Sequence, residues 1–154
     1  MSPGRMLENE RGSLEHAVAI AAEAHAGQVD KAGAPYLLHP LRVMLRMNTD
    51  HERIVAVLHD VVEDSDWTLE QLRQEGFADD ILDGIESVTR REDETYHDFV
   101  RRAALNPVGR RVKLADLRDN CDLTRIPNPS DRDRRRLEKY RRAISLLERL
   151  DESS

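Results

Sequence analysis

The chain has 154 residues, of which 39% are hydrophobic and 35% charged, a balance typical of one soluble domain built from amphipathic helices. Its formal net charge of −6 argues against nucleic-acid binding, because a basic face supplies most of that affinity. No apolar run approaches the roughly 18 residues needed to span a bilayer, and residues 1–11 lack the apolar stretch of a signal peptide. Cys121 is the only cysteine and excludes an intrachain disulfide, so we expect a cytoplasmic protein without a membrane partner.

Helical spacing, capping residues and breakers predict an all-α fold, a compact single-domain bundle of about eight helices. No segment alternates as a strand would, and no internal repeat is visible. We expect a polar segment over residues 1–12 and one domain over residues 13–150. In chain order, the predicted helices cover residues 13–27, 40–47, 52–62, 68–76, 79–88, 96–105, 107–117 and 131–150.

Start signals support most of these boundaries. Ser13, Thr68 and Thr95 are typical helix caps, and the Asn106-Pro107 pair is typical of a helix start. A residue before proline avoids the helical region, so His39, which precedes Pro40, is expected at the mouth of its helix.

The segment Leu58-His59-Asp60-Val61-Val62-Glu63-Asp64 carries the chemistry. His59 and Glu63 are four residues apart, as are Asp60 and Asp64, so each pair shares one face of the apolar helix 52–62. Burying these groups is costly unless a divalent cation compensates their charge. A helix end that emerges into solvent would explain Glu63 and Asp64 alone, but not His59 and Asp60 inside the apolar run.

Two other segments can complete a metal site. His39 stands at a loop–helix junction, and Asp116 ends the apolar run Val112-Lys113-Leu114-Ala115, with Asn120 one turn later. Taken singly, His39 and Asp116 are also typical of caps or surface positions. Two imidazoles and two carboxylates suit manganese, iron, cobalt or zinc better than calcium.

Four segments in this order resemble the alarmone hydrolases of the HD-domain superfamily, which include the hydrolase halves of Rel/Spo homologues and the stand-alone small alarmone hydrolases. The resemblance spans residues 24–140, and from the length of the chain we expect the stand-alone form. It implies an HD-type helical bundle that hydrolyses the 3′-pyrophosphate of a small-molecule nucleotide, (p)ppGpp, with manganese as cofactor. The matching segments are AHAGQ at 24–28, GAPYLLHP at 33–40, VLHDVVEDS at 57–65 and VKLADLRDN at 112–120.

The resemblance also implies roles for single residues. His39, His59, Asp60 and Asp116 would ligate the metal. Glu63 and Asp64 would orient and activate the attacking water.

On the substrate side, Asn120 would lie near the metal and the sugar, Lys31 would line the nucleotide pocket, and Tyr140 would contact the nucleotide. A tyrosine at the spacing of Tyr140 is also typical of plain core. Arg136, in the basic run 132–136, would steady the diphosphate, although such a run is equally typical of a solvated helix start.

Two positions depart from the family pattern. Asp30 stands where an arginine usually stacks on the base, so guanosine and adenosine alarmones both stay open. Asp119 replaces the common histidine before Asn120. Two alternative functions also remain: an HD phosphohydrolase acting on another nucleotide, such as NADPH or a nucleoside monophosphate, and a non-catalytic nucleotide sensor.

Overall fold

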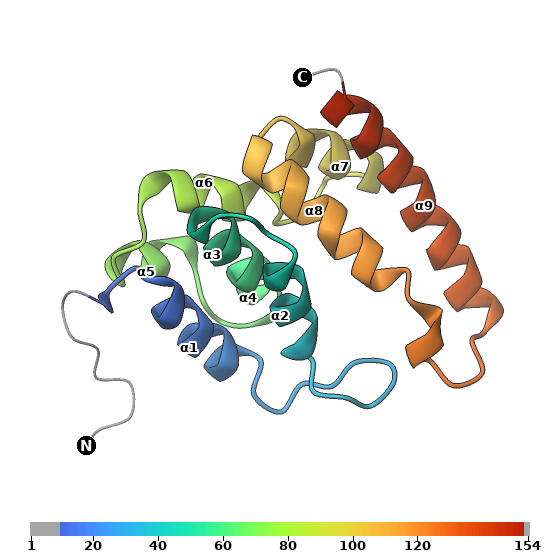
Figure 1. The fold of residues 1–154 in the computed structure, drawn as a ribbon, viewed down its shortest axis with the longest axis horizontal. Helices are drawn as coiled ribbons and strands as arrows, with labels where there is room; N and C mark the ends of the chain where they lie inside the picture. The colour runs from blue at the N-terminus through green and yellow to red at the C-terminus, as the bar shows by residue number, and fades with distance from the viewer. Residues whose placement is uncertain (1–9, 153–154) are drawn as a thin grey trace.

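The computed structural model describes residues 10–152, which fold into helices joined by short loops (Figure 1). Within that range the only strand-like pairing is an isolated bridge between Val29 and Pro35, so the all-α prediction is confirmed. Residues 1–9 of the predicted polar segment 1–12 lie outside the described residues. The helices are α1 (Leu14–Ala24), α2 (Leu38–Leu45), α3 (Asp50–Leu58), α4 (Val61–Asp64), α5 (Leu69–Gln74), α6 (Asp79–Ser87), α7 (Tyr96–Ala104), α8 (Pro107–Asn120), the 3₁₀ turn η2 (Leu123–Arg125) and α9 (Asp131–Glu152).

Side-chain caps begin four of these helices as predicted. The hydroxyl groups of Ser13, Thr68 and Thr95 and the amide oxygen of Asn106 each accept hydrogen bonds from backbone N–H groups of the first turn. Such caps satisfy donors that a helix start otherwise leaves without partners. Among residues 10–152, no helix combines the length and apolar character that a membrane span requires.

The start of α2 differs from the prediction. The helix begins at Leu38, so His39 is its second residue instead of the residue before it. Pro40 causes no break there, because the first turn of a helix has no intrahelical acceptor for its N–H groups. His39 is buried by this placement.

The predicted central helix 52–62 is divided in the structure. α3 ends at Leu58, and the N–H of His59 donates to the carbonyl oxygen of Ala56, three residues back, which tightens the chain. α4 begins at Val61, after Asp60 has taken the backbone angles φ −102° and ψ −3°. The prediction of one continuous helix over residues 52–62 is therefore wrong, and His59 and Asp60 lie at the break between the two helices.

α8 lies between two groups of buried apolar side chains. One group joins α8 to α1, α2, α3, α4, α5, α6 and Ala103 of α7, and the other joins it to the rest of α7 and to α9. Figure 1 shows α9 running beside α8, while the long loop between α1 and α2 reaches toward the end of α8. The polar residues of α8 are therefore held next to those of α2 and of the α3–α4 break.

Candidate metal centre and adjoining pocket

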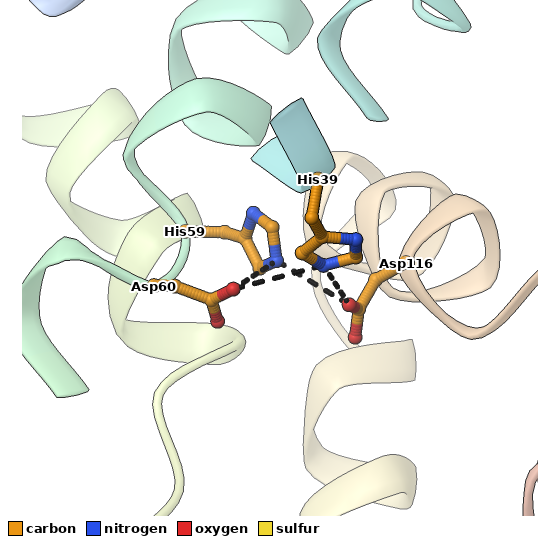
Figure 2. A group of neighbouring side chains, drawn as sticks. All are labelled: His39, His59, Asp60 and Asp116. Carbon is orange, nitrogen blue, oxygen red and sulfur yellow. Dashed lines mark hydrogen bonds and ion pairs between the residues drawn. The ribbon is translucent and has the colours of Figure 1, made fainter. Parts of the chain in front are cut away.

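Four predicted ligands converge on one point. His39 comes from α2, His59 and Asp60 from the break between α3 and α4, and Asp116 from α8. One nitrogen or oxygen atom of each lies within 4.8 Å of those of the others, and Figure 2 shows the four side chains facing one another. The cluster is almost closed to solvent, since the Asp60 side chain, its most exposed member, is 13% exposed.

His59 shows why this cluster fits a cation. Its Nδ1 donates to the carbonyl oxygen of Ala56 at 2.5 Å, which leaves the lone pair of Nε2 directed at the cluster. Nε2 lies 3.0 Å from Asp60 Oδ2 and 3.4 Å from Asp116 Oδ1, but it is buried without a hydrogen bond to any described residue. A buried polar atom without a hydrogen bond is unfavourable, and a metal ion bound there would satisfy it.

Lys113 and the histidines control the charge of Asp116. Burial opposes ionisation of Asp116, yet Lys113, His39 and His59 hold its pKa well below the usual value. The ammonium group of Lys113 is itself buried and donates to Asp116 Oδ2 at 3.0 Å. Asp116 therefore stays anionic, and two imidazoles with two carboxylates can hold a divalent transition metal.

Glu63 and Asp64 form an acidic edge beside the cluster. Both reach solvent, but the protein around them removes enough water to raise the pKa of each carboxyl group, and the charge of Asp60 adds to the effect. The backbone N–H of Arg90 donates to Glu63 Oε1 and fixes its side chain. A carboxylate with a raised pKa is a better proton acceptor near neutral pH.

A pocket of about 270 Å³ adjoins the cluster through two residues. Tyr36 lines the pocket and donates its hydroxyl proton to Asp60 Oδ2 at 2.5 Å. Asn120 lines it as well and donates to Asp116 Oδ1 at 3.2 Å. A ligand in the pocket would therefore lie against the ligands of the candidate metal site.

All four residues predicted to contact the substrate line this pocket: Lys31, Asn120, Arg136 and Tyr140. Of the arginines in the run 132–136, Arg136 alone is part of the pocket lining, while the other arginines are exposed. Lys31 Nζ lies 3.3 Å and Arg136 Nη1 lies 3.8 Å from Asp133 Oδ1, so one carboxylate holds both cations. Tyr140 lines the pocket and also packs against the apolar side chains that join α8 to α7 and α9.

The side chain of Asp30 stabilises the loop between α1 and α2. Its Oδ1 accepts hydrogen bonds from the backbone N–H groups of Ala32 and Ala34, both at 2.9 Å. This bonding closes the turn that carries Lys31. It gives a local reason for an aspartate at this position.

Sequence reasoning did not assign roles to several residues of the site. Tyr36 and Lys113 stood inside the quoted motifs, and only their contacts with Asp60 and Asp116 reveal what they do. Arg90 and Lys139 come from segments without a motif, and both lie over the ring of Tyr96. No spacing in the sequence indicates that these two cations meet at one ring.

Comparisons with known proteins agree with this geometry. Residues 17–119 match the HD domain family, so the chain belongs to the HD domain family. The chain is 34% identical over 119 residues to an Aquifex aeolicus protein named guanosine-3′,5′-bis(diphosphate) 3′-pyrophosphohydrolase, a match over 70% of this chain and 17% of that protein. It is 32% identical over 103 residues to the Escherichia coli protein named bifunctional (p)ppGpp synthase/hydrolase SpoT, covering 64% of this chain and 14% of that protein. The chain thus spans a small part of the length of these relatives.

A solved structure confirms the fold. It is described as a metazoan ortholog of SpoT that hydrolyses ppGpp and plays a role in starvation responses. The two chains superpose with a TM-score of 0.71 over 87% of this chain and 84% of the other, at 21% sequence identity. The HD-type helical fold is therefore shared.

Proposed function

We propose that this HD-domain protein is a manganese-dependent hydrolase of the 3′-pyrophosphate of a guanosine or adenosine alarmone such as (p)ppGpp. The observation that carries the proposal is the contact of three parts: the four-ligand cluster, the acidic edge, and the pocket that Tyr36 and Asn120 join to the cluster. The activity for which the Aquifex aeolicus relative is named supports the same reaction.

His39, His59, Asp60 and Asp116 are the proposed ligands of the metal ion. A divalent cation supplies Lewis-acid chemistry and lowers the pKa of water at such a site. The buried Nε2 of His59 supports this assignment, because no described residue hydrogen-bonds to it.

Glu63 and Asp64 are the proposed proton acceptors. Water would attack the phosphorus bonded to the 3′ oxygen and lose a proton to one of these carboxylates. The bond between that phosphorus and the 3′ oxygen would break, and the 3′ oxygen would take up a proton. The products would be pyrophosphate and a nucleotide with a free 3′ hydroxyl group.

The pocket is the proposed place of the nucleotide. Lys31 and Arg136 supply positive charge for phosphates, Asn120 lies nearest the cluster, and Tyr140 offers an aromatic face. Asp30 and Asp133 also face this pocket, so much of its positive charge is balanced by carboxylates. Because Asp30 stands where the family commonly has a stacking arginine, guanosine and adenosine alarmones are both candidate substrates.

The decisive experiment is incubation of the manganese-loaded protein with guanosine and adenosine alarmones while released pyrophosphate is measured. We expect pyrophosphate and no inorganic phosphate in the first turnovers. Asp60→Ala is the negative control.

Two results would contradict the proposal. Release of phosphate from NADPH or from a nucleoside monophosphate, with alarmones untouched, would indicate a different phosphohydrolase. Tight alarmone binding without product, measured by equilibrium dialysis with manganese present, would indicate a nucleotide sensor.

A further inference from the structure

Asp119 is a buried carboxylate behind the candidate metal centre. Its side chain is 2% exposed, and it lies one turn after Asp116 in α8. Its Oδ2 lies 2.7 Å from Nδ1 of His39, on the side of the ring opposite to the cluster. The other ring nitrogen, Nε2, lies 2.8 Å from Asp116 Oδ1.

These contacts determine which nitrogen of His39 can bind a metal. A carboxylate accepts a proton from Nδ1, so the neutral ring keeps its proton there and presents the lone pair of Nε2 to the cluster. The carbonyl oxygen of Ala56 does the same for His59, but it belongs to the backbone. For His39 the acceptor is a side chain, and a single substitution can remove it.

Two arginines hold Asp119 in place. Arg42, one turn after His39 in α2, donates through Nε to Oδ1 at 2.8 Å and through Nη2 to Oδ2 at 3.1 Å. Arg125, from the pocket wall, donates to Oδ1 at 3.3 Å and to the Asp119 backbone oxygen at 2.8 Å. A two-point guanidinium contact fixes both the position and the plane of a carboxylate.

We propose that Asp119 is a positioning residue that fixes the tautomer and orientation of His39, so that Nε2 is ready for the metal. The inference rests on the metal site of the proposed function, but not on the identity of the substrate. It gives a role to a residue that stands where the resembling family commonly has a histidine.

The test is manganese affinity, measured by calorimetry on the metal-free protein and its variants. Loss of an outer partner of a metal-bound histidine typically weakens metal binding by about 10- to 100-fold, and we expect Asp119→Ala to fall in that range. Asp119→Asn keeps an oxygen that can accept from Nδ1, so it should lose less. In the metal-free protein both ring nitrogens of His39 face carboxylates. Nitrogen NMR of the ring should therefore show a proton on Nδ1 in the parent, whereas Asp119→Ala should lose that proton and keep the one on Nε2 that faces Asp116.

Glu52→Gln is the matched control. Glu52 is also a buried carboxylate bonded to an arginine, with Arg111 Nη1 at 2.6 Å from its Oε2, but it caps α3 and does not contact His39. This control should lose stability and keep the parent affinity for manganese, whereas a general loosening of the fold would weaken both variants alike.

Folding of the variants is checked by thermal unfolding without metal. If Asp119→Ala does not fold, the double variant Arg42→Gln/Asp119→Asn takes its place, because it leaves no Arg42 cation facing a neutral side chain. Parent-like manganese affinity and an unchanged His39 tautomer in the folded variant would overturn the inference. Neither measurement involves turnover. Both can therefore be interpreted even if the proposed reaction is wrong, and the two failures can be told apart.

Discussion

The metal centre and the pocket beside it are built in different ways. The centre takes its ligands from helices that pack against the core, and each buried charge there has a specific partner such as Lys113 or Asp119. The pocket is walled by the loop around Lys31 and by the start of α9, where side chains are more exposed and pair with one another. The centre should therefore tolerate almost no change, while the pocket should tolerate substitution with graded losses.

Removal of a metal ligand should have the largest effect. Asp60→Ala deletes a carboxylate from the cluster, and we expect turnover to drop at least about 1,000-fold, because both metal binding and its charge stabilisation are lost. Initial rates of pyrophosphate release and calorimetric titration with manganese would measure this. Asp66→Asn, an exposed acid just after α4, is the control and should behave like the parent.

Substitution of Glu63 should separate metal binding from catalysis. Glu63→Gln keeps the size of the side chain but removes the proton acceptor, and we expect kcat to fall by roughly 10²- to 10⁴-fold. Manganese affinity should stay near that of the parent, because Glu63 is outside the four-ligand cluster. A variant that turned over at the parent rate would assign the proton transfer to Asp64 alone.

A change in the pocket should be milder. Arg136→Ala removes a cation from the pocket wall, and loss of a charge-assisted hydrogen bond to a phosphate corresponds to about a tenfold rise in KM or somewhat more. Manganese affinity should not change. Arg135→Ala is the control, because Arg135 is exposed and outside the pocket lining, and equal effects of the two substitutions would contradict the assignment.

The same contrast explains what the sequence predicts well. Caps at Ser13, Thr68 and Thr95 depend on neighbouring residues alone, and they appear as predicted. The convergence of His39 and Asp116 is a long-range fact, since the two residues are 77 positions apart, and the resemblance to a family predicted it where spacing could not. The break at His59 and Asp60 was missed, because the apolar pattern continues through it.

The pocket was less predictable in physical terms. Its charges act through pairs between distant segments, as between Lys31 and Asp133, and no local pattern encodes such a pair. Composition identified the basic run 132–136, but only helix orientation decides that Arg136 lines the pocket while Arg132, Arg134 and Arg135 are exposed. The role of Asp119 likewise depends on contacts with α2 and η2 that the sequence does not reveal.

The smallest predicted effect concerns the loop of residues 88–95 between α6 and α7, which supports the acidic edge formed by Glu63 and Asp64. Arg102 holds this loop by donating to the backbone oxygens of Glu86 and Thr89 and through a two-point contact with Glu94, at 2.7 and 2.9 Å. The same loop carries Arg90, whose N–H fixes Glu63. Because Arg102 stabilises the ionised form, the pKa of Glu94 is lowered to about 2.

Glu94→Gln should therefore lower the free energy of unfolding by about 1–3 kcal/mol near neutral pH, where the native pair is fully ionised. A carboxyl group whose pKa is depressed in the folded state stabilises the fold above its ordinary pKa and loses that contribution as the pH falls toward the depressed value. The difference between parent and variant should thus shrink as the pH drops from 4.5 toward about 2. Urea unfolding of both proteins across this range measures the difference, and a gap that stays constant with pH would mean that the ion pair does not stabilise the loop.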